Sequence, residues 1–301
     1  MNTRRAGLAW AFLAVLLWSL SIPLTKAALG GFDVFVVAMG REVIAGLIAS
    51  IILLIRRPKF PDRSLWKPLA WTALGAVFGW PLLLALGLQY SSSAHAAVIT
   101  SVMPLVTAAL AVLVGGEKVR RVFWLAAAVG TATLVIYSSS RGGLEGGSLL
   151  GDLLLIGAVL TSSWGYVFGA STARQMPGWQ VISWIVALTL PITLPFTVIM
   201  WLGSRTNFSP DGGQWSALVI LGVFSAYLGF FAWYRGLAMA GTAMGSQVQQ
   251  LQALLAIGWS AVLLGEQITL GTVLAACVVI VAVAWAQRAR ISSGALSAPL
   301  D

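Results

Sequence analysis

The chain has 301 residues, of which 59% are hydrophobic and only 9% are charged. Soluble domains carry about 25% charged residues, so this composition excludes an ordinary soluble protein, whose surface these few charges could not cover. The net charge of +9 arises from short segments between apolar runs, without a basic stripe interleaved with aromatic residues, so we expect no nucleic-acid partner.

Apolar runs long enough to cross a bilayer recur along the whole chain. A helix needs about 20 mostly apolar residues to span the hydrocarbon core. Ten such runs cover residues 7–29, 33–55, 66–88, 94–114, 120–138, 149–171, 179–202, 214–237, 241–264 and 269–287. The sequence therefore predicts an all-α integral membrane protein with ten transmembrane helices, surrounded by the lipid bilayer.

The distribution of Lys and Arg predicts the orientation of these spans. Short cytoplasmic loops carry an excess of basic residues. With the N-terminus inside, the cytoplasmic segments hold Arg4, Arg5, the cluster from Arg56 to Lys67, Lys118, Arg120, Arg121, Arg174, Arg235, Arg288 and Arg290. The outer segments hold only Lys26, Arg41, Arg141 and Arg205. We therefore expect both termini to be cytoplasmic.

An internal repeat divides the sequence into two halves. A shift of 149 positions places Trp66 on Trp215, Gly87-Leu88 on Gly236-Leu237, and Gly116-Glu117 on Gly265-Glu266. Each half contains five spans, an odd number, so the second half must enter the membrane from the opposite side. We expect a first five-helix repeat over residues 1–140, an inverted second repeat over 141–291, and a cytoplasmic tail over 292–301. Inverted repeats place a binding site near the midplane and expose it alternately to each side.

The ninth run is unusually rich in amides. Ser246, Gln249, Gln250 and Gln252 lie within it, although polar groups at bilayer depth are costly unless they are paired or hydrated. On a helix, Gln249 and Gln252 share a broad face with Gln250 at its edge. Such a face could line a hydrated cavity and bind the ammonium and carboxylate of an amino acid. The alternative is hydrogen bonding between helices that serves only packing.

Aromatic residues form a second group of candidate substrate contacts. Trp18 and Trp164 lie near the centres of their runs, where indoles are poor interfacial anchors, and a shift of 146 relates them. Trp80 and Tyr227 are further candidates. These rings could stack on an apolar substrate side chain, and core packing is the alternative for each.

The fourth and second runs contain the remaining candidates. His95, the only histidine, precedes Ile99 and Met103 by one and two helical turns, and it either contacts substrate or has a structural role. One histidine cannot assemble a metal cluster, so we expect no metal and no cofactor. Arg41 and Glu42 lie inside the second run, either as a local ion pair or with Arg41 attracting a substrate carboxylate.

Several short motifs together resemble a known family. They are Trp18-Ser19, Pro23 and Lys26 in the first run, Arg41 in the second, Pro104 in the fourth, and the pairs Gly116-Glu117 and Gly265-Glu266. In this order they resemble the drug/metabolite transporter superfamily, in particular its ten-helix EamA-type exporters, over nearly the whole chain. Ala253 departs from the pattern, since it stands where the first half has Pro104.

The resemblance is strongest to family members that export aromatic amino acids. It implies efflux of aromatic and other neutral amino acids from a bacterial cytoplasm, across the inner membrane, by alternating access. Because Glu42 is the only notable intramembrane carboxylate, we expect facilitated diffusion, with coupling to protons or membrane potential as the alternative.

The sequence is also compatible with other functions. A lipophilic cation or another small metabolite is the second substrate class. An intramembrane enzyme is the competing functional class, but neither an HExxH nor a GxSxG motif occurs, so we expect no catalytic residues. The sequence leaves the oligomeric state open, with a monomer as the simplest expectation.

Overall fold

The structure is a computed structural model that describes residues 3–91, 96, 99–138, 148–204, 206–252, 255, 259 and 270–288, where every regular element is a helix. Six segments in these ranges are long and apolar enough to cross a membrane. They are Thr3–Leu29, Val34–Arg56, Arg63–Gly87, Leu149–Thr172, Gly178–Ser204 and Gly212–Ala240. These six lie over the first three runs and the sixth to eighth runs of the sequence prediction.

Three of the six segments are single helices and three are composite. The single helices are α3 (Val34–Arg56), α9 (Leu149–Thr172) and α10 (Gly178–Ser204). The first segment consists of α1 (Thr3–Trp18) and α2 (Ser21–Leu29). The third consists of α4 (Arg63–Ala73), the π-helix η1 (Leu74–Gly79) and α5 (Trp80–Gly87). The sixth segment, which lies over the eighth predicted run, consists of α11 (Gly212–Ile220), the π-helix η3 (Leu221–Gly229) and α12 (Phe230–Ala240).

Shorter or less completely described helices lie over the other four predicted runs. They are α7 (Met103–Leu113), α8 (Arg121–Ser138), α13 (Thr242–Ser246) with the 3₁₀ helix η4 (Gln247–Gln249), and α15 (Leu270–Arg288). His95, Ala253, Glu266 and the tail over 292–301 lie outside the described residues. The described residues thus form an all-helical structure with six candidate spans, and the full count of ten spans stays a prediction.

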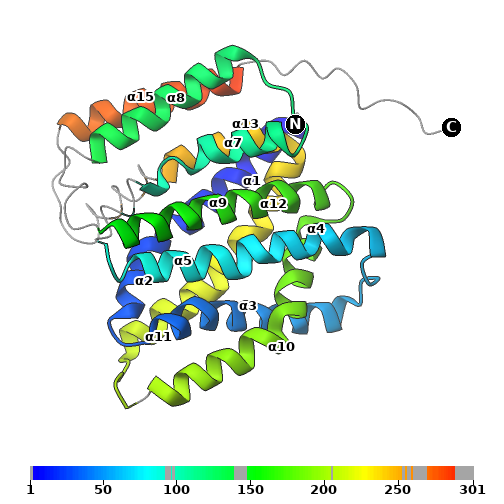
Figure 1. The fold of residues 1–301 in the computed structure, drawn as a ribbon. Coiled ribbons are helices and arrows are strands. Elements are labelled where there is room, and N and C mark those ends of the chain that lie inside the picture. The colour runs from blue at the N-terminus through cyan, green and yellow to red at the C-terminus, as the bar shows by residue number, and fades with distance from the viewer. Residues whose placement is uncertain are drawn as a thin grey trace.

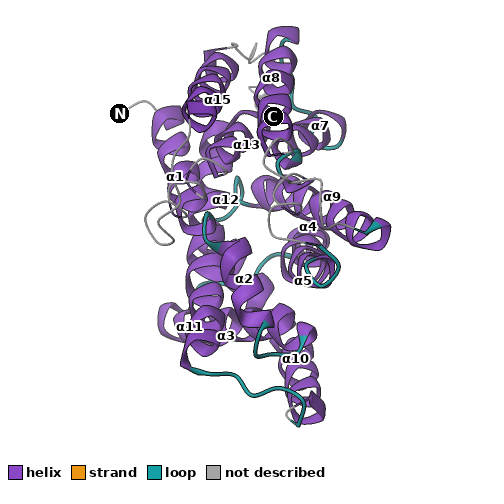
Figure 2. Ribbon diagram, turned by 90° about the vertical axis from the view of Figure 1, so that its left-hand side faces the viewer, coloured by secondary structure: helices purple, strands orange, loops and turns teal. Residues whose placement is uncertain are grey.

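Helices that are far apart in the sequence lie side by side (Figure 1). The most extensive contacts are between α3 and α10, between α1 and α12, between α8 and α15, and between α9 and the pair α4 and α5. Seen from the side, α8 and α15 lie at one end of the stack and α3 and α10 at the other (Figure 2). Each of these contacts joins the N-terminal part of the chain to the C-terminal part, so the middle of the stack is built from both.

The two π-helices occupy corresponding places in the chain. A shift of 149 positions carries residues 74–79 of η1 onto 223–228, which lie inside η3. A π-helix is rare and occurs frequently at functional sites. The segments Arg63–Gly87 and Gly212–Ala240 therefore depart from the regular α form at corresponding positions.

A glycine pair brings η1 against α9. A Cβ atom built on Gly75 would lie 2.7 Å from the backbone nitrogen of Gly165 and 2.8 Å from its Cα atom, and it would also meet the carbonyl oxygen of Thr161. These neighbours are backbone atoms, which cannot swing aside as a flexible side chain can. The close contact between the two segments therefore depends on the missing side chain at Gly75.

We expect Gly75→Ala to lower the stability of the purified protein by about 1–3 kcal/mol, because overpacking forces backbone displacement. The measurement is the apparent melting temperature in detergent. Gly203→Ala is the matched control, because a Cβ atom there meets nothing within 4 Å. Equal melting temperatures for the two variants would contradict the proposed packing constraint.

Candidate functional site

Trp18, at the C-terminal end of α1, lies at the centre of a buried group of rings. Its indole stacks on the Tyr166 ring of α9, with centroids 5.7 Å apart and planes inclined by 10°. It also contacts Phe230 at 5.0 Å and Trp233 at 5.2 Å, both on α12. We call Trp18, Tyr166, Phe230 and Trp233 the aromatic cluster. All four side chains are buried, so the cluster belongs to the interior where α1, α9 and α12 meet.

Two amides predicted to contact substrate reach this cluster. Gln249 Nε2 lies 3.4 Å from the Tyr166 hydroxyl and 3.5 Å from the sulfur atom of Met103. Gln252 Nε2 donates a hydrogen bond to the Trp18 carbonyl oxygen at 3.2 Å. The Gln249 Oε1 atom is buried and has no hydrogen-bond partner among the described residues. It is therefore an acceptor that a bound ammonium or amide could satisfy.

A charged pair is attached to the same cluster through Ser225 of η3. The Trp18 indole nitrogen donates to the Ser225 carbonyl oxygen at 2.9 Å, and Arg41 Nη2 donates to the Ser225 hydroxyl at 3.0 Å. Ser21 shares a hydrogen bond of 2.8 Å with that hydroxyl. Arg41 Nε lies 3.2 Å from Glu42 Oε1, and both residues are almost completely buried. Two opposite charges thus lie together beside the buried rings.

The remaining polar candidates contact other parts of the fold. The Ser246 hydroxyl and the Gln247 amide donate to the Pro104 carbonyl oxygen at 3.3 and 3.2 Å. Gln250 Nε2 donates to Gln247 Oε1 at 2.9 Å and to the Ala127 carbonyl at 3.4 Å. These bonds connect α13, η4 and the residue that follows η4 with α7 and α8.

Trp164 lies apart from the aromatic cluster although it is only two residues from Tyr166. Two residues correspond to about 200° around a helix, so the two side chains leave α9 on different faces. Trp164 packs against Trp71, with centroids 5.7 Å apart, and against Phe168 at 5.0 Å. The structure thus stacks Tyr166 on Trp18, whereas Trp164, which the sequence analysis expected to line the same cavity as Trp18, packs on other rings.

The other predicted contacts divide between two locations. Trp80 and Ile99 are partly buried and pack against the hydrophobic group that includes Leu84 and Leu155. Tyr227 lies on η3, and its hydroxyl shares a hydrogen bond of 2.7 Å with the Ser183 hydroxyl of α10. The sequence reasoning missed Ser21, Tyr166 and Ser225, because single small hydroxyls and aromatic rings in apolar runs carry no distinctive spacing.

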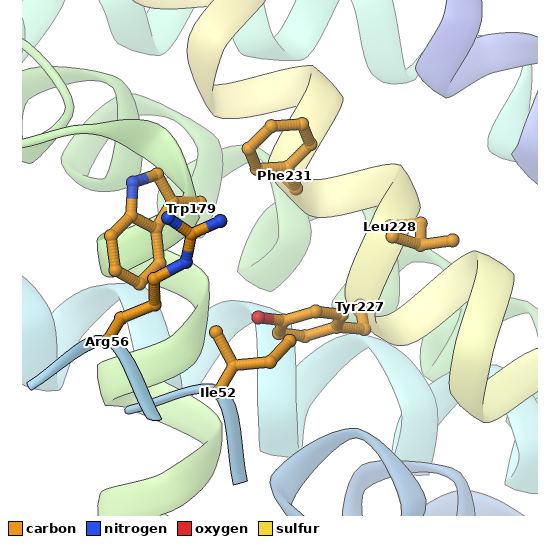
Figure 3. A pocket seen from close by; sticks show the side chains of 6 residues that line it. All are labelled: Ile52, Arg56, Trp179, Tyr227, Leu228 and Phe231. Carbon is orange, nitrogen blue, oxygen red and sulfur yellow. The ribbon is translucent and has the colours of Figure 1, made fainter. Parts of the chain in front are cut away.

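A cavity of about 340 Å³ lies at one side of Tyr227. Its lining residues are Ile52, Arg56, Trp179, Tyr227, Leu228 and Phe231 (Figure 3). The hydroxyl end of Tyr227 points towards the Arg56 and Trp179 side of this space (Figure 3). The cavity therefore combines apolar walls with one guanidinium and one phenol.

Glu117, which follows α7, connects three segments at one end of the molecule. Its carboxylate accepts hydrogen bonds from the backbone nitrogens of Thr242 and Ala243, at 2.7 and 2.8 Å, and so caps α13. Arg174, just beyond α9, donates to the same carboxylate at 2.7 Å. Gly116 has a φ of +68°, a conformation that favours glycine. The Gly-Glu pair thus turns the chain and supplies the cap.

We expect Glu117→Ala to lower stability by about 1–2 kcal/mol, the usual cost of removing a helix cap. The measurement is again the melting temperature in detergent. Asp62→Ala is the control, because Asp62 precedes α4 without forming a side-chain cap. An Asp62→Ala variant that loses as much stability as Glu117→Ala would argue against a specific role for the Glu117 cap.

Comparisons with known proteins agree with a transporter. The family model of the EamA-like transporter family matches residues 5–139 and 149–287. The chain is 38% identical to the uncharacterized transporter YdeK of Bacillus subtilis (strain 168), over 96% of this chain and 99% of YdeK. It is 27% identical to the uncharacterized transporter YvbV of the same organism, over 88% and 86% of the two chains. A solved structure described only as a crystal structure of a protein shares the fold, with a TM-score of 0.74, 20% identity, and coverage of 94% and 96%.

Proposed function

The chain belongs to the EamA-like transporter family, and from this premise we propose that it exports aromatic and other neutral amino acids from the cytoplasm by alternating access. Family membership and the relatives identify it as a multi-pass membrane transporter. The substrate class, the direction of transport, the topology and the binding residues are the proposal. The aromatic cluster next to the Arg41–Glu42 pair is the observation on which it rests.

The proposed topology has ten spans arranged as two inverted five-helix halves, with both termini in the cytoplasm. Three observations support it. The family model matches the chain twice, over 5–139 and 149–287. The π-helices η1 and η3 occur at positions related by the sequence repeat. The most extensive helix contacts pair an N-terminal helix with a C-terminal one, as two halves enclosing one site would.

The proposed substrate is a zwitterion with an apolar side chain. Arg41 and Glu42 are adjacent and oppositely charged, so they match a carboxylate and an ammonium respectively. The unpartnered Gln249 Oε1 atom offers a further acceptor for the ammonium. Trp18 and Tyr166 already stack on each other, and an aromatic substrate ring could take the place of either partner at little energetic cost.

Substrate entry in this mechanism requires the two halves to separate. The side chains around Trp18 are buried and in mutual contact, which corresponds to a closed arrangement. On the proposed cytoplasmic side, Glu117 joins α13 and Arg174 to the segment that follows α7. Breaking these contacts opens the cytoplasmic path, and re-forming them commits the transporter to release outside.

A lipophilic cation is the second candidate substrate, because Glu42 is a buried carboxylate. Its ion pair with Arg41 makes this candidate weaker. A cation alone would have to displace Arg41 and leave the guanidinium unpaired in a buried place, which is costly. A zwitterion supplies a partner to each member of the pair.

We expect Trp18→Ala to lower phenylalanine counterflow in proteoliposomes by about tenfold, because loss of a stacking partner and its buried surface costs at least about 1.4 kcal/mol. Counterflow of alanine should fall less. Trp164→Ala is the matched control, because its ring packs on Trp71 and Phe168. A uniform loss across substrates, or equal effects of the two variants, would contradict the proposed site.

We also expect amino-acid flux to be insensitive to an imposed pH gradient. The intramembrane carboxylate Glu42 is held in an ion pair with Arg41, and a proton carrier must instead cycle between charged and neutral forms during transport. The measurement is flux into proteoliposomes with and without the gradient at zero membrane potential. Strong stimulation by the gradient would show that transport is coupled to protons.

A further inference from the structure

The cavity beside Tyr227 is lined by Tyr227 and Leu228 of η3 and by Phe231 of α12. On this helix Phe230 and Trp233 point inward and are buried, whereas Arg235 is exposed. Leu228, which lines the cavity, is 37% exposed. On α3, Ile51, Leu54 and Ile55 next to the lining residues Ile52 and Arg56 are 57%, 73% and 73% exposed. Exposed apolar surface of this extent on a membrane protein faces lipid chains, so the cavity is accessible from the bilayer.

The mouth of the cavity is positively charged. Arg56 is the last residue of α3 and lines the cavity. Arg235 lies one helical turn beyond the lining residue Phe231, on the same face of α12, and its guanidinium lies 4.5 Å from the centre of the Trp10 ring. The six lining residues include no carboxylate. An anionic group in the cavity would therefore meet the Arg56 guanidinium, with Arg235 as a further cation on the same face of α12.

One indole lines the cavity, and a second contacts one of its lining residues. Trp179 lines the cavity at the beginning of α10, and Trp10 contacts both Phe231 and Arg235. Trp side chains concentrate at the level of lipid headgroups, where one part of the ring is apolar and the nitrogen is hydrated. Basic residues at this level on the cytoplasmic side attract anionic lipids. Charge and aromatic content thus place the mouth at the depth of the headgroups.

We propose that this cavity binds an anionic phospholipid of the cytoplasmic leaflet, with its phosphate at Arg56 and its first chain carbons against Ile52, Leu228 and Phe231. The volume of about 340 Å³ accommodates a headgroup and the beginning of a chain, and the rest of the chain would lie along Leu47 and Ile51, which are 47% and 57% exposed. The assignment to the cytoplasmic leaflet rests on the proposed orientation; the lipid class rests on the cavity itself.

The same cavity explains how such a lipid would affect the transporter. It is lined by α3, α10, η3 and α12, and its Tyr227 hydroxyl bonds to Ser183 of α10. Tyr227 lies two residues after Ser225, which holds Arg41. A lipid that fills the cavity stabilises the packing of α3 and α10 on η3, and therefore favours the arrangement in which the Arg41–Ser225 bond is made.

The test is native mass spectrometry of the purified protein with phosphatidylglycerol and phosphatidylcholine of identical chains. We expect one tightly held phosphatidylglycerol and no comparable phosphatidylcholine. Arg56→Gln should weaken this binding about fivefold, the effect of one basic residue at an anionic surface. Lys59→Gln is the matched control, because Lys59 is an exposed cation just beyond α3 and does not line the cavity. The Lys59→Gln variant should bind phosphatidylglycerol as tightly as the original protein does.

Three results would overturn the proposal. They are equal binding of the two lipids, equal weakening by Arg56→Gln and Lys59→Gln, and displacement of the lipid by excess inorganic phosphate, which would indicate a site for soluble anions. Ile52→Trp, which fills the cavity without changing the charge, should also remove the bound lipid. Lipid binding is measured without transport, so a failure here is distinguishable from a failure of the proposed amino-acid export.

Discussion

The hydrocarbon core of a membrane contains no water to hydrogen-bond polar groups, so each buried polar group must find its partner within the protein. This requirement determines the arrangement around Trp18. The Trp18 indole donates to Ser225, Arg41 donates to the hydroxyl of the same residue, and Glu42 balances the Arg41 charge. Removal of any one partner leaves another unsatisfied, which costs more than the net stabilisation of a single hydrogen bond. The polar groups are therefore mutually dependent, and they hold α1, α3 and η3 in a single relative position.

The same interdependence gives the proposed transport mechanism its physical basis. A substrate that binds Arg41, Glu42 or Gln249 must replace contacts that those residues make in the closed arrangement. Substrate binding can therefore change the equilibrium between the closed and open arrangements. The size of this change is set by the difference in the substrate's affinity for the two arrangements. Glu117 lies far along the chain from these groups, yet it also joins segments on either side of the repeat boundary. Contacts of this kind can be exchanged without unfolding a helix.

Much of the helical architecture could be predicted because lipid imposes a simple pattern of length and hydrophobicity. The predicted run 33–55 and the helix Val34–Arg56 differ by one residue at each end. The site was harder to predict, for local reasons. A 3₁₀ helix advances by about 120° per residue instead of 100°, so η4 alters which amides share a face: Gln249 meets Tyr166, whereas Gln250 meets Gln247 and Ala127. Ser225 owes its position to a π-helix, a form that amino-acid periodicity does not encode.

The two π-helices bear on how such a bundle could move. A π turn holds one residue more than the α turn it replaces, and this surplus residue can pass from one turn to the next while nearly all backbone hydrogen bonds remain made. When the extra residue moves along the helix, each residue that it passes rotates by roughly 100° about the helix axis. In η3 the affected stretch includes Ser225 and Tyr227, one bonded to Arg41 and the other to Ser183. Such a shift within η3 would redirect both side chains without altering the rest of the segment Gly212–Ala240.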